Sequence, residues 1–241
     1  MNNKTIVIIP TYNEIENISK IIDLVISEDK NIDVLVVDDN SPDGTSSIVS
    51  QKEVIFKNRV FLIKRLDKKG LGTAYIEGFR WALKRKYDFI VSMDADFSHN
   101  PSELTKMIKY FSNEVDVVVG SRYLNGVSVV NWPIGRIFLS YIAQIYVRLI
   151  TGMPINDPTS GFVAYSKESV NALNLDKFRF IGYAFQIEMK YKIWKKKFKL
   201  KEHQIIFMNR ELGESKLDKR IILEAVFGVL KLRLDSILKR L

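Results

Sequence analysis

Short apolar runs alternate with segments of helical periodicity through the first half of this 241-residue chain. Five runs have the length and the residue types of buried strands: residues 4–9, 32–37, 60–63, 89–93 and 115–119. Apolar residues recur at helical spacing in segments between or after these runs: residues 14–26, 71–86 and 101–111. Strands that alternate with helices in this way predict an α/β fold with a parallel, doubly wound sheet.

The pattern becomes less regular in the second half of the chain. We expect amphipathic helices at residues 137–150 and 182–194, and a strand at residues 198–207 whose lysines alternate outward. Residues 217–241 are expected to form a final helix, whose wide apolar arc would bind a membrane surface or pack on the domain. We therefore expect one domain over residues 1–216, followed by this C-terminal amphipathic helix.

Carboxylate side chains follow three of the predicted strands. Glu14 follows the first strand, Asp38 and Asp39 follow the second, and Asp94 and Asp96 follow the fourth. Because the carboxyl ends of parallel strands meet at one edge of a sheet, we expect these acids to share a rim, where open α/β sheets bind their ligands. The alternative for each is a solvated acid in a loop, since Asp is common after strands.

Asp94 and Asp96 stand one residue apart and are expected to converge, because side chains at positions i and i+2 of an extended segment point the same way. Two converging carboxylates favour a hard divalent cation, so we expect Mg²⁺ or Mn²⁺ here. Such a rim suits a nucleotide diphosphate with its metal, and Asp39 is placed to accept hydrogen bonds from the base or the ribose.

Other motifs are less specific. The P-loop pattern GxxxxGK[ST] does not occur, and residues 68–78 carry Tyr75 where a dinucleotide fingerprint needs glycine. Arg122, just past the fifth strand, is expected to contact a phosphate, although a surface arginine would have the same pattern. His99 is a weaker metal candidate, and Glu188 is either a core or loop-anchoring acid or a general base.

The net charge of +9 is concentrated late in the chain. Residues 190–201 hold seven lysines and no acid, and residues 216–241 hold seven basic residues against three acids. This distribution indicates an anionic partner, such as a phosphate-rich substrate or an anionic membrane face, with a solvated surface as the alternative. We expect no nucleic-acid partner, although the aromatic residues among the lysines have a spacing that suits core packing as well as base stacking.

The N-terminus is not expected to be a signal peptide, since Pro10 ends a six-residue apolar span. No stretch reaches the ~18 uninterrupted apolar residues of a membrane-spanning helix, because Gln144 and Arg148 interrupt the longest run. We therefore expect a protein that is soluble or lies on a surface. The absence of cysteine excludes disulfides and thiolate metal sites.

Eight short motifs follow one another along the chain: PTYNE (10–14), VDDNSPDGT (37–45), MDADFSHNP (93–101), GSRY (120–123), NWPIGRIFLS (131–140), DPTSGF (157–162), GYAFQIEM (182–189) and NRELGESK (209–216). Together they resemble the family-two glycosyltransferases that make polyprenyl-phosphate sugars, the group of the dolichol-phosphate mannose synthases. The resemblance implies a GT-A (Rossmann-like) fold and inverting transfer of a hexose, mannose from GDP-mannose, to dolichyl or undecaprenyl phosphate. It also implies a cytoplasmic enzyme, peripheral on the cytoplasmic face of a membrane.

The resemblance also assigns roles to particular positions. The donor-binding positions are Pro10, Tyr12, Glu14, Val37, Asp39, Asp94, Ala95, Asp96, Arg210 and Lys216. Asp94 and Asp96 match the metal ligands and, together with Arg122, the catalytic positions. The acceptor-phosphate positions are Arg122, Arg136 and Ser140. Ser98 stands where some relatives carry glutamine near the metal, so the choice between Mg²⁺ and Mn²⁺ stays open.

An acceptor phosphate would need no protein base, because its second pKa of about 6 leaves it largely ionised near neutral pH. The multi-helix membrane extensions of the family are not expected here, so residues 137–150 and the final helix would supply any membrane contact. One alternative is a UDP-glucose-dependent enzyme acting on a polyprenyl phosphate or on a glycan, whose hydroxyl would require Glu188 as base. An alternative of another class is a non-catalytic nucleotide-binding protein of the membrane surface.

Overall fold

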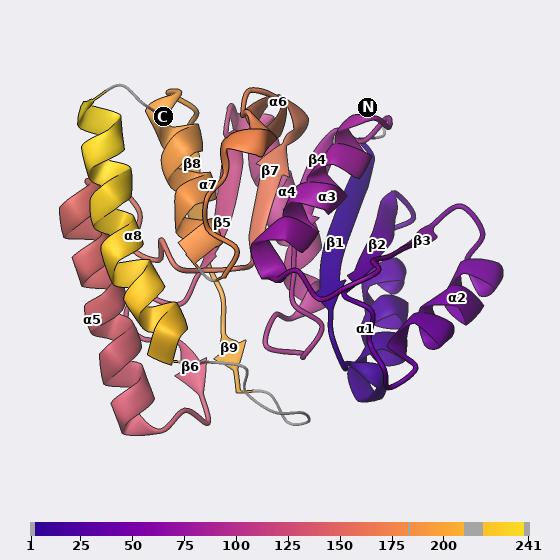
Figure 1. Cartoon of the computed structure of the whole chain (residues 1–241). Helices are drawn as coiled ribbons and strands as arrows, with labels where there is room; N and C mark the ends of the chain where they lie inside the picture. Colours follow the sequence, from indigo (N-terminus) through magenta and orange to yellow (C-terminus); the bar gives the residue numbers. More distant parts are fainter. Residues whose placement is uncertain (1–2, 183, 210–218, 239–241) are drawn as a thin grey trace.

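The computed structural model describes residues 3–182, 184–209 and 219–238 (Figure 1). Its described strands form a central seven-stranded sheet in the order β3-β2-β1-β4-β7-β5-β8. Neighbouring strands are parallel, except that β7 runs antiparallel to both β4 and β5. The strands are β1 (Thr5–Thr11), β2 (Ile32–Asp38), β3 (Val60–Lys64), β4 (Phe89–Ser92), β5 (Val117–Ser121), β7 (Val163–Ser166) and β8 (Leu200–Gln204).

Helices cover both faces of this sheet, and a two-stranded sheet lies beside its carboxyl edge (Figure 1). The described helices are α1 (Ile15–Glu28), α2 (Thr45–Ile55), α3 (Leu71–Leu83), α4 (Leu104–Lys109), α5 (Ile134–Thr151), α6 (Lys167–Asn171), α7 (Ala184–Lys195) and α8 (Lys219–Ile237). Short 3-10 helices lie at Pro101–Glu103, Tyr110–Asn113 and Leu175–Lys177. The small sheet pairs β6 (Val129–Val130) with β9 (Phe207–Met208) in parallel.

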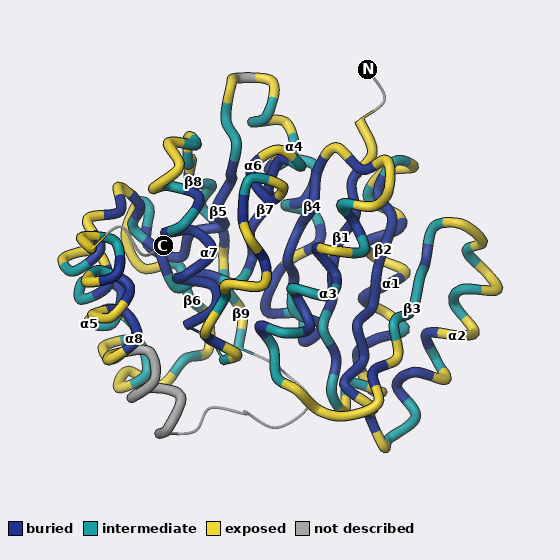
Figure 2. Tube along the Cα trace, turned by 45° about the horizontal axis from the view of Figure 1, so that its top comes forward, coloured by how far each residue is buried: buried dark blue, intermediate teal, exposed yellow. Residues whose placement is uncertain are grey.

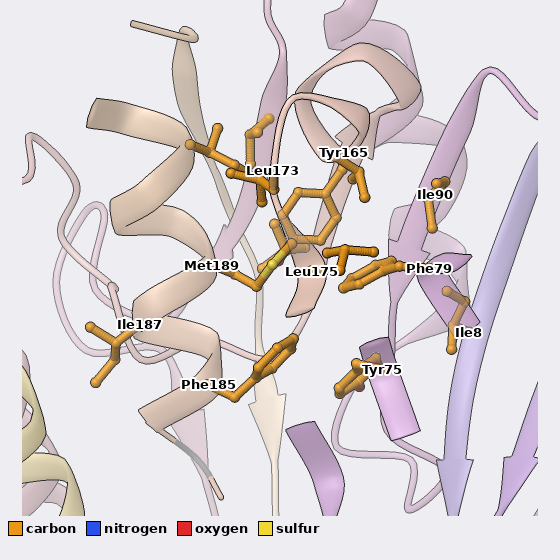
Figure 3. Close-up of a cluster of buried hydrophobic side chains, with 14 of the residues drawn as sticks. Ile8, Tyr75, Phe79, Ile90, Tyr165, Leu173, Leu175, Phe185, Ile187 and Met189 are labelled. Carbon is orange, nitrogen blue, oxygen red and sulfur yellow. The ribbon is translucent and has the colours of Figure 1, made fainter. Parts of the chain in front are cut away.

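The two faces of the sheet carry separate hydrophobic clusters, as the pleat of a strand requires. Ile6 and Ile8 of β1 belong to one cluster, while Val7 and Ile9 belong to the other. In the first cluster, Ile8 packs with aromatic rings of α3 and α7 (Figure 3). The rings of Tyr75 on α3 and Phe185 on α7 stack at a centroid distance of 6.0 Å. The alternation seen in the sequence therefore produces a sheet that is buried on both sides, with its loops at the two edges.

Two expectations about the elements were wrong, and the helix expected at residues 101–111 is confirmed but only partly α-helical. The sheet is not wholly parallel, because it contains the unpredicted strand β7, which pairs antiparallel with both β4 and β5. Residues 198–207 form no single strand: β8 follows β5 only as far as the pair Ser121↔Gln204, and the chain then enters the small sheet as β9. Residues 101–111 are a short α-helix with 3-10 turns at both ends.

α5 and α8 lie side by side at one end of the molecule (Figure 1), and both keep exposed stretches there (Figure 2). Among the described helices, α5 has the length and apolar composition to cross a membrane, by those two criteria alone. The sequence had predicted no such helix, but α5 begins three residues earlier than expected, at Ile134, and ends one residue later, at Thr151, and so reaches 18 residues. α8 packs on α5 and α7, and the division of the chain at residue 216 stays a prediction.

Candidate active site

The predicted rim exists because β2, β1 and β4 are neighbours in the sheet. Thr11 at the end of β1 pairs with Asp38 at the end of β2, and Pro10 pairs with Val37. β4 ends at Ser92, which pairs with Ile8 of β1. The loops that follow these three strands therefore start at one edge of the sheet, as the sequence predicted.

Hydrogen bonds join the first two loops of the rim. Asp38 is buried and accepts hydrogen bonds from the hydroxyls of Thr11 (2.8 Å) and Ser41 (2.6 Å). The backbone N–H of Glu14 donates to Thr45 Oγ1 at 3.0 Å, and the Glu14 carboxylate accepts from Asn17. Asp38 thus holds the loops together, whereas Glu14 lies half-buried at the start of α1.

Asp39 pairs with an arginine that the sequence did not single out. Arg65 follows β3, the next strand of the sheet, and its Nη1 forms an ion pair with Asp39 Oδ1 at 2.7 Å. The backbone N–H groups of Lys69 and Gly70 donate to Asp39 Oδ2 at 3.3 and 3.2 Å. Across this loop, the Lys68 ammonium lies 3.8 Å from the centre of the Tyr12 ring. The predicted nucleoside residues Tyr12 and Asp39 are thus gathered by the segment that follows β3.

The carboxylates of Asp94 and Asp96 lie in a tight turn just after β4. Asp94 is partly exposed, and the Tyr75 hydroxyl lies 3.4 Å from its Oδ1. Asp96 is 8% exposed, and its Oδ1 accepts hydrogen bonds from the backbone N–H (3.1 Å) and the hydroxyl (2.6 Å) of Ser98. Phe97, between Asp96 and Ser98, has a φ of 61°. Residues other than glycine seldom adopt this left-handed conformation, and functional sites often retain it.

This pair fits a hard divalent cation, although it does not form a complete metal cage. In the described part of the chain, no cluster of three or more His, Cys, Asp or Glu residues could hold a metal. Mg²⁺ and Mn²⁺ commonly take one or two carboxylates and complete their shell with water and substrate phosphates. His99 is occupied otherwise, because its Nδ1 accepts the backbone N–H of Asp94 at 3.1 Å. Burial lowers the pKa of His99, against the opposing influence of Asp94 and Asp96, and keeps the ring neutral.

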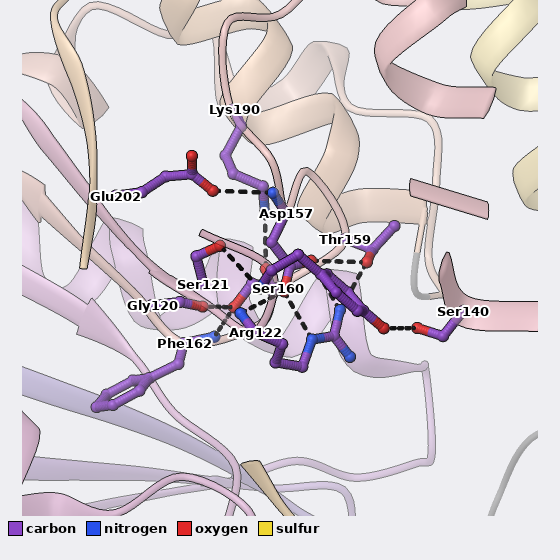
Figure 4. A network of polar contacts seen from close by, with 11 residues as sticks. Gly120, Ser121, Arg122, Ser140, Asp157, Thr159, Ser160, Phe162, Lys190 and Glu202 are labelled. Atoms are coloured by element: carbon purple, nitrogen blue, oxygen red, sulfur yellow. Dashed lines mark hydrogen bonds and ion pairs between the residues drawn. The ribbon is translucent and has the colours of Figure 1, made fainter. Parts of the chain in front are cut away.

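Arg122 lies beside this turn but is already paired (Figure 4). Its Nε and Nη2 donate to the two carboxylate oxygens of Asp157 at 2.6 and 2.7 Å, and Nη2 also donates to Thr159 Oγ1 at 2.7 Å. Burial acts to raise the pKa of Asp157, but the adjacent guanidinium outweighs it and the pKa is lowered. Among the described contacts, Nη1 is the guanidinium nitrogen without a hydrogen bond. Sequence reasoning missed Asp157, although it opens the motif DPTSGF.

A second layer supports the loop that carries Asp157 (Figure 4). Lys190 of α7 is fully buried and donates from Nζ to the carbonyl of Ser160 at 2.7 Å. Burial lowers its pKa to about 7. The Ser160 hydroxyl donates to the Gly120 carbonyl at 2.6 Å, and the Asp157 N–H donates to Glu202 at 2.9 Å. The lysine-rich run at 190–201 is therefore not a uniform charged surface, because its first lysine is a core residue.

Two of the predicted acceptor residues, Arg136 and Ser140, lie on α5, and aromatic side chains connect them to the third, Arg122. The Tyr123 hydroxyl donates to Ser140 Oγ at 2.7 Å. Arg136 Nη1 donates to Asn209 Oδ1 at 2.9 Å, and its guanidinium lies 4.0 Å from the centre of the Trp132 ring. The structure thus brings Arg122, Arg136 and Ser140 together, whereas Arg210 and Lys216 lie outside the described residues.

Glu188 is a loop-anchoring residue. Its side chain is buried, and Oε2 accepts the backbone N–H groups of Arg179 (3.1 Å) and Phe180 (3.3 Å). Oε1 forms an ion pair with Lys192 Nζ at 2.7 Å. These contacts fix the segment before α7 against α3, where the carbonyl of Ile181 accepts the N–H of Gly72 at 2.8 Å. The carboxylate is therefore engaged in holding backbone.

Relatives of known name match nearly the whole chain. The protein is 41% identical over 226 residues to the polyprenol monophosphomannose synthase of Mycolicibacterium smegmatis, across 94% of this chain and 85% of that protein. It is 40% identical to the undecaprenyl-phosphate mannosyltransferase of Micrococcus luteus, across 94% and 92%. It is 38% identical to the dolichol-phosphate mannosyltransferase of Pyrococcus furiosus, across 95% of this chain and 63% of that protein.

Solved structures of lower identity share the fold. Glucosyl-3-phosphoglycerate synthase from Mycobacterium tuberculosis, in complex with phosphoglyceric acid, matches with a TM-score of 0.71 at 16% identity, across 95% of this chain and 80% of that one. Its complex with Mn²⁺, UDP-glucose and phosphoglyceric acid gives 0.70 at 17%, across 96% and 79%. This likeness confirms the predicted GT-A fold. The model of glycosyl transferase family 2 matches residues 6–173, and the chain therefore belongs to that family.

Proposed function

We propose that the protein transfers mannose from GDP-mannose to a polyprenyl phosphate, with inversion at the anomeric carbon. The observation that carries the proposal is the arrangement at one edge of the sheet. The turn of Asp94 and Asp96 adjoins the Arg122–Asp157 pair, and Arg136 and Ser140 extend this polar surface onto an exposed apolar helix. The names of the three relatives at about 40% identity support the substrates.

The chemistry requires positioning and charge neutralisation more than proton transfer. A phosphate oxygen of the acceptor forms a bond to the anomeric carbon while the bond from that carbon to the GDP diphosphate breaks, and GDP leaves. A divalent cation held by Asp94 and Asp96 would neutralise the leaving diphosphate. Manganese in the UDP-glucose complex of the M. tuberculosis synthase supports a divalent metal in this fold, and Mg²⁺ or Mn²⁺ would serve here. Arg122 and Arg136 would hold the incoming phosphate in line.

The acceptor is proposed to be a phosphate because Glu188, the base that a glycan acceptor would need, is already engaged in other contacts. A glycan hydroxyl must lose a proton during attack, whereas a phosphate monoester is already ionised. Glu188, the candidate base, is buried and binds two backbone N–H groups and Lys192. UDP-glucose in place of GDP-mannose remains the alternative donor, since the structurally similar M. tuberculosis synthase was solved with UDP-glucose.

Membrane contact is proposed to run through α5 and α8, at the cytoplasmic face that the family resemblance implies. Large apolar side chains are exposed on α5: Ile134, Phe138, Leu139, Tyr141, Ile142 and Leu149. The neighbouring helix α8 exposes a second set: Val226, Phe227, Leu230, Leu234 and Ile237. An apolar helix face beside basic residues binds at a bilayer interface, and the same helix α5 carries Arg136 and Ser140. The lipid tail of the acceptor would then lie in the membrane beside α5, and its phosphate would reach the rim.

A donor screen tests this function. Purified protein is incubated with undecaprenyl phosphate, with Mg²⁺ or Mn²⁺, and with radiolabelled GDP-mannose or UDP-glucose. Label in the lipid phase from GDP-mannose alone is expected, and label that reaches only a saccharide acceptor would refute the proposal. Asp96→Ala is expected to abolish transfer, whereas Asp23→Ala on the outer side of α1 is expected to leave it unchanged. An Asp96→Ala variant with full activity would favour a role for the acid outside catalysis.

A further inference from the structure

Trp132 lies close to both arginines of the proposed acceptor site. It stands in the segment between β6 and α5, where its ring centre is 4.0 Å from the Arg136 guanidinium and 5.8 Å from that of Arg122. The edge-to-face contact of Trp132 with Phe207 of β9, at 5.3 Å, fixes the plane of the ring. Within the described residues, no other aromatic ring has both guanidinium groups this close. A cation above a tryptophan face is attracted by the ring quadrupole, so the ring can orient Arg136, the nearer of the two guanidinium groups.

The indole N–H of Trp132 is a second, independent observation. Its Nε1 is buried and has no hydrogen-bond partner among the described residues. Buried tryptophan N–H groups usually find an acceptor, and an unpaired one calls for an explanation. An incoming phosphate would supply such an acceptor, because it brings three strongly accepting oxygens.

Much of the Arg122 guanidinium is engaged before any phosphate binds. Asp157 and Thr159 already occupy its Nε and Nη2, and the carboxylate neutralises its charge. Arg136 donates from Nη1 to the side-chain oxygen of Asn209 at 2.9 Å. A phosphate bound here therefore meets one arginine compensated by a buried carboxylate, a second arginine stacked on Trp132, and an indole N–H beside both.

We propose that Trp132 is a binding residue of the acceptor-phosphate site. Its ring positions the guanidinium of Arg136 opposite Arg122, and its N–H donates a hydrogen bond to a phosphate oxygen of the prenyl phosphate. The inference rests on the proposed function, because it takes a prenyl phosphate as the ligand of this site. It adds a residue to which the motif resemblance assigned no role, and it separates two contributions of one side chain, the face and the N–H.

Two substitutions separate these contributions. Trp132→Phe keeps an aromatic face and removes the N–H, and Trp132→Leu removes both. A hydrogen bond to a charged group changes affinity by about 10- to 100-fold, so the KM for farnesyl phosphate is expected to rise about 10-fold or more in the Phe variant. It is expected to rise further in the Leu variant, while the KM for the sugar nucleotide stays within about twofold of wild type in both.

The matched control is Trp81→Phe. Trp81 on α3 also stacks with an arginine, with Arg85 at 3.5 Å from its ring centre, but it packs against Tyr87 away from the rim. This control is expected to leave the KM for both substrates unchanged. Direct binding is read from the fluorescence of a Trp81→Phe/Trp194→Phe protein, in which Trp132 is the remaining tryptophan. Farnesyl phosphate is expected to change that emission saturably, without sugar nucleotide present.

The outcomes distinguish the inference from the function on which it rests. An unchanged KM for farnesyl phosphate in Trp132→Phe would overturn the inference. So would an equal rise in both KM values for Trp132→Leu, which would mean a purely structural role. If wild-type protein neither binds nor mannosylates farnesyl or undecaprenyl phosphate, the proposed function fails instead. Circular dichroism and thermal unfolding of both variants verify that they are folded.

Discussion

Replacing Asp157 by asparagine tests the pair that organises the candidate active site. Asp157 is fully buried and accepts three hydrogen bonds from Arg122, including one from its backbone N–H at 3.0 Å, and a fourth from Thr159. Asparagine has nearly the same shape but lacks the charge, and its amide NH₂ would face guanidinium donors. Asp157→Asn therefore leaves the buried guanidinium of Arg122 without its counter-charge.

The expected loss is large because both partners are out of water. Removing one member of a buried ion pair costs about 3–5 kcal/mol of unfolding free energy, several times the value of an exposed pair. Removing both charges, in Arg122→Met/Asp157→Asn, is expected to cost less than the sum of the two single changes, by about 1–3 kcal/mol. The double variant is expected to be folded but inactive, since it lacks the phosphate-binding guanidinium.

Urea unfolding, followed by circular dichroism at pH 7, measures these differences for the wild type, the two single variants Arg122→Met and Asp157→Asn, and the double variant. The acid side of the stability curve gives an independent check, because the pKa of Asp157 is lowered in the fold. Its stabilisation is present above the unfolded-state pKa of about 3.9 and is lost as the pH falls through the lower folded value. A loss of less than about 1 kcal/mol in Asp157→Asn, or strictly additive single and double changes, would refute the reasoning.

Two further predictions concern buried positions. Lys190 has a pKa of about 7 in the folded state and of about 10.4 in the unfolded state. Between these pH values the unfolded state binds more protons, so the free energy of unfolding should rise with pH, by at most ~1.4 kcal/mol per pH unit. Lys190→Met should flatten this slope in urea unfolding at pH 7 and 9; an unaltered slope would contradict it. Gly228→Ala would place a Cβ 2.5 Å from the Phe180 ring and should lower Tm, unlike Gly135→Ala, which meets nothing within 4 Å.

The sequence was most informative where strands are long and alternate with helices. β1 and β2 are seven residues each and are buried except for the half-buried Pro10, so their largely apolar pattern decides the fold class. β7 and β9 have four and two residues, too few for any period, and their partners lie far away in the chain. The insertion of an antiparallel strand between β4 and β5 depends on tertiary packing, so a local sequence pattern does not predict it.

The same reasoning separates the site residues that were predicted from those that were missed. Asp39, Asp94 and Asp96 follow strands, and the strand order alone brings them to one rim. Arg65 follows β3 in the same manner and could have been found, but its basic surroundings resembled a solvated loop. Asp157 reaches Arg122 from 35 residues away, through a loop held by a buried lysine, so its position depends on packing.

The pairing of Arg122 also changes how charge is distributed at the rim. The sequence placed Arg122 beside the acids as a cation for phosphate, but Asp157 compensates that charge before any ligand arrives. The pair instead supplies a rigid donor whose orientation is fixed by two oxygens, which lowers the entropic cost of binding. On the proposed function, part of the positive charge that two phosphate-bearing substrates need would then come from a divalent cation bound at Asp94 and Asp96. Because Arg136 stacks on Trp132 at the start of α5, insertion of that helix into a bilayer would set the height of the acceptor phosphate relative to such a cation.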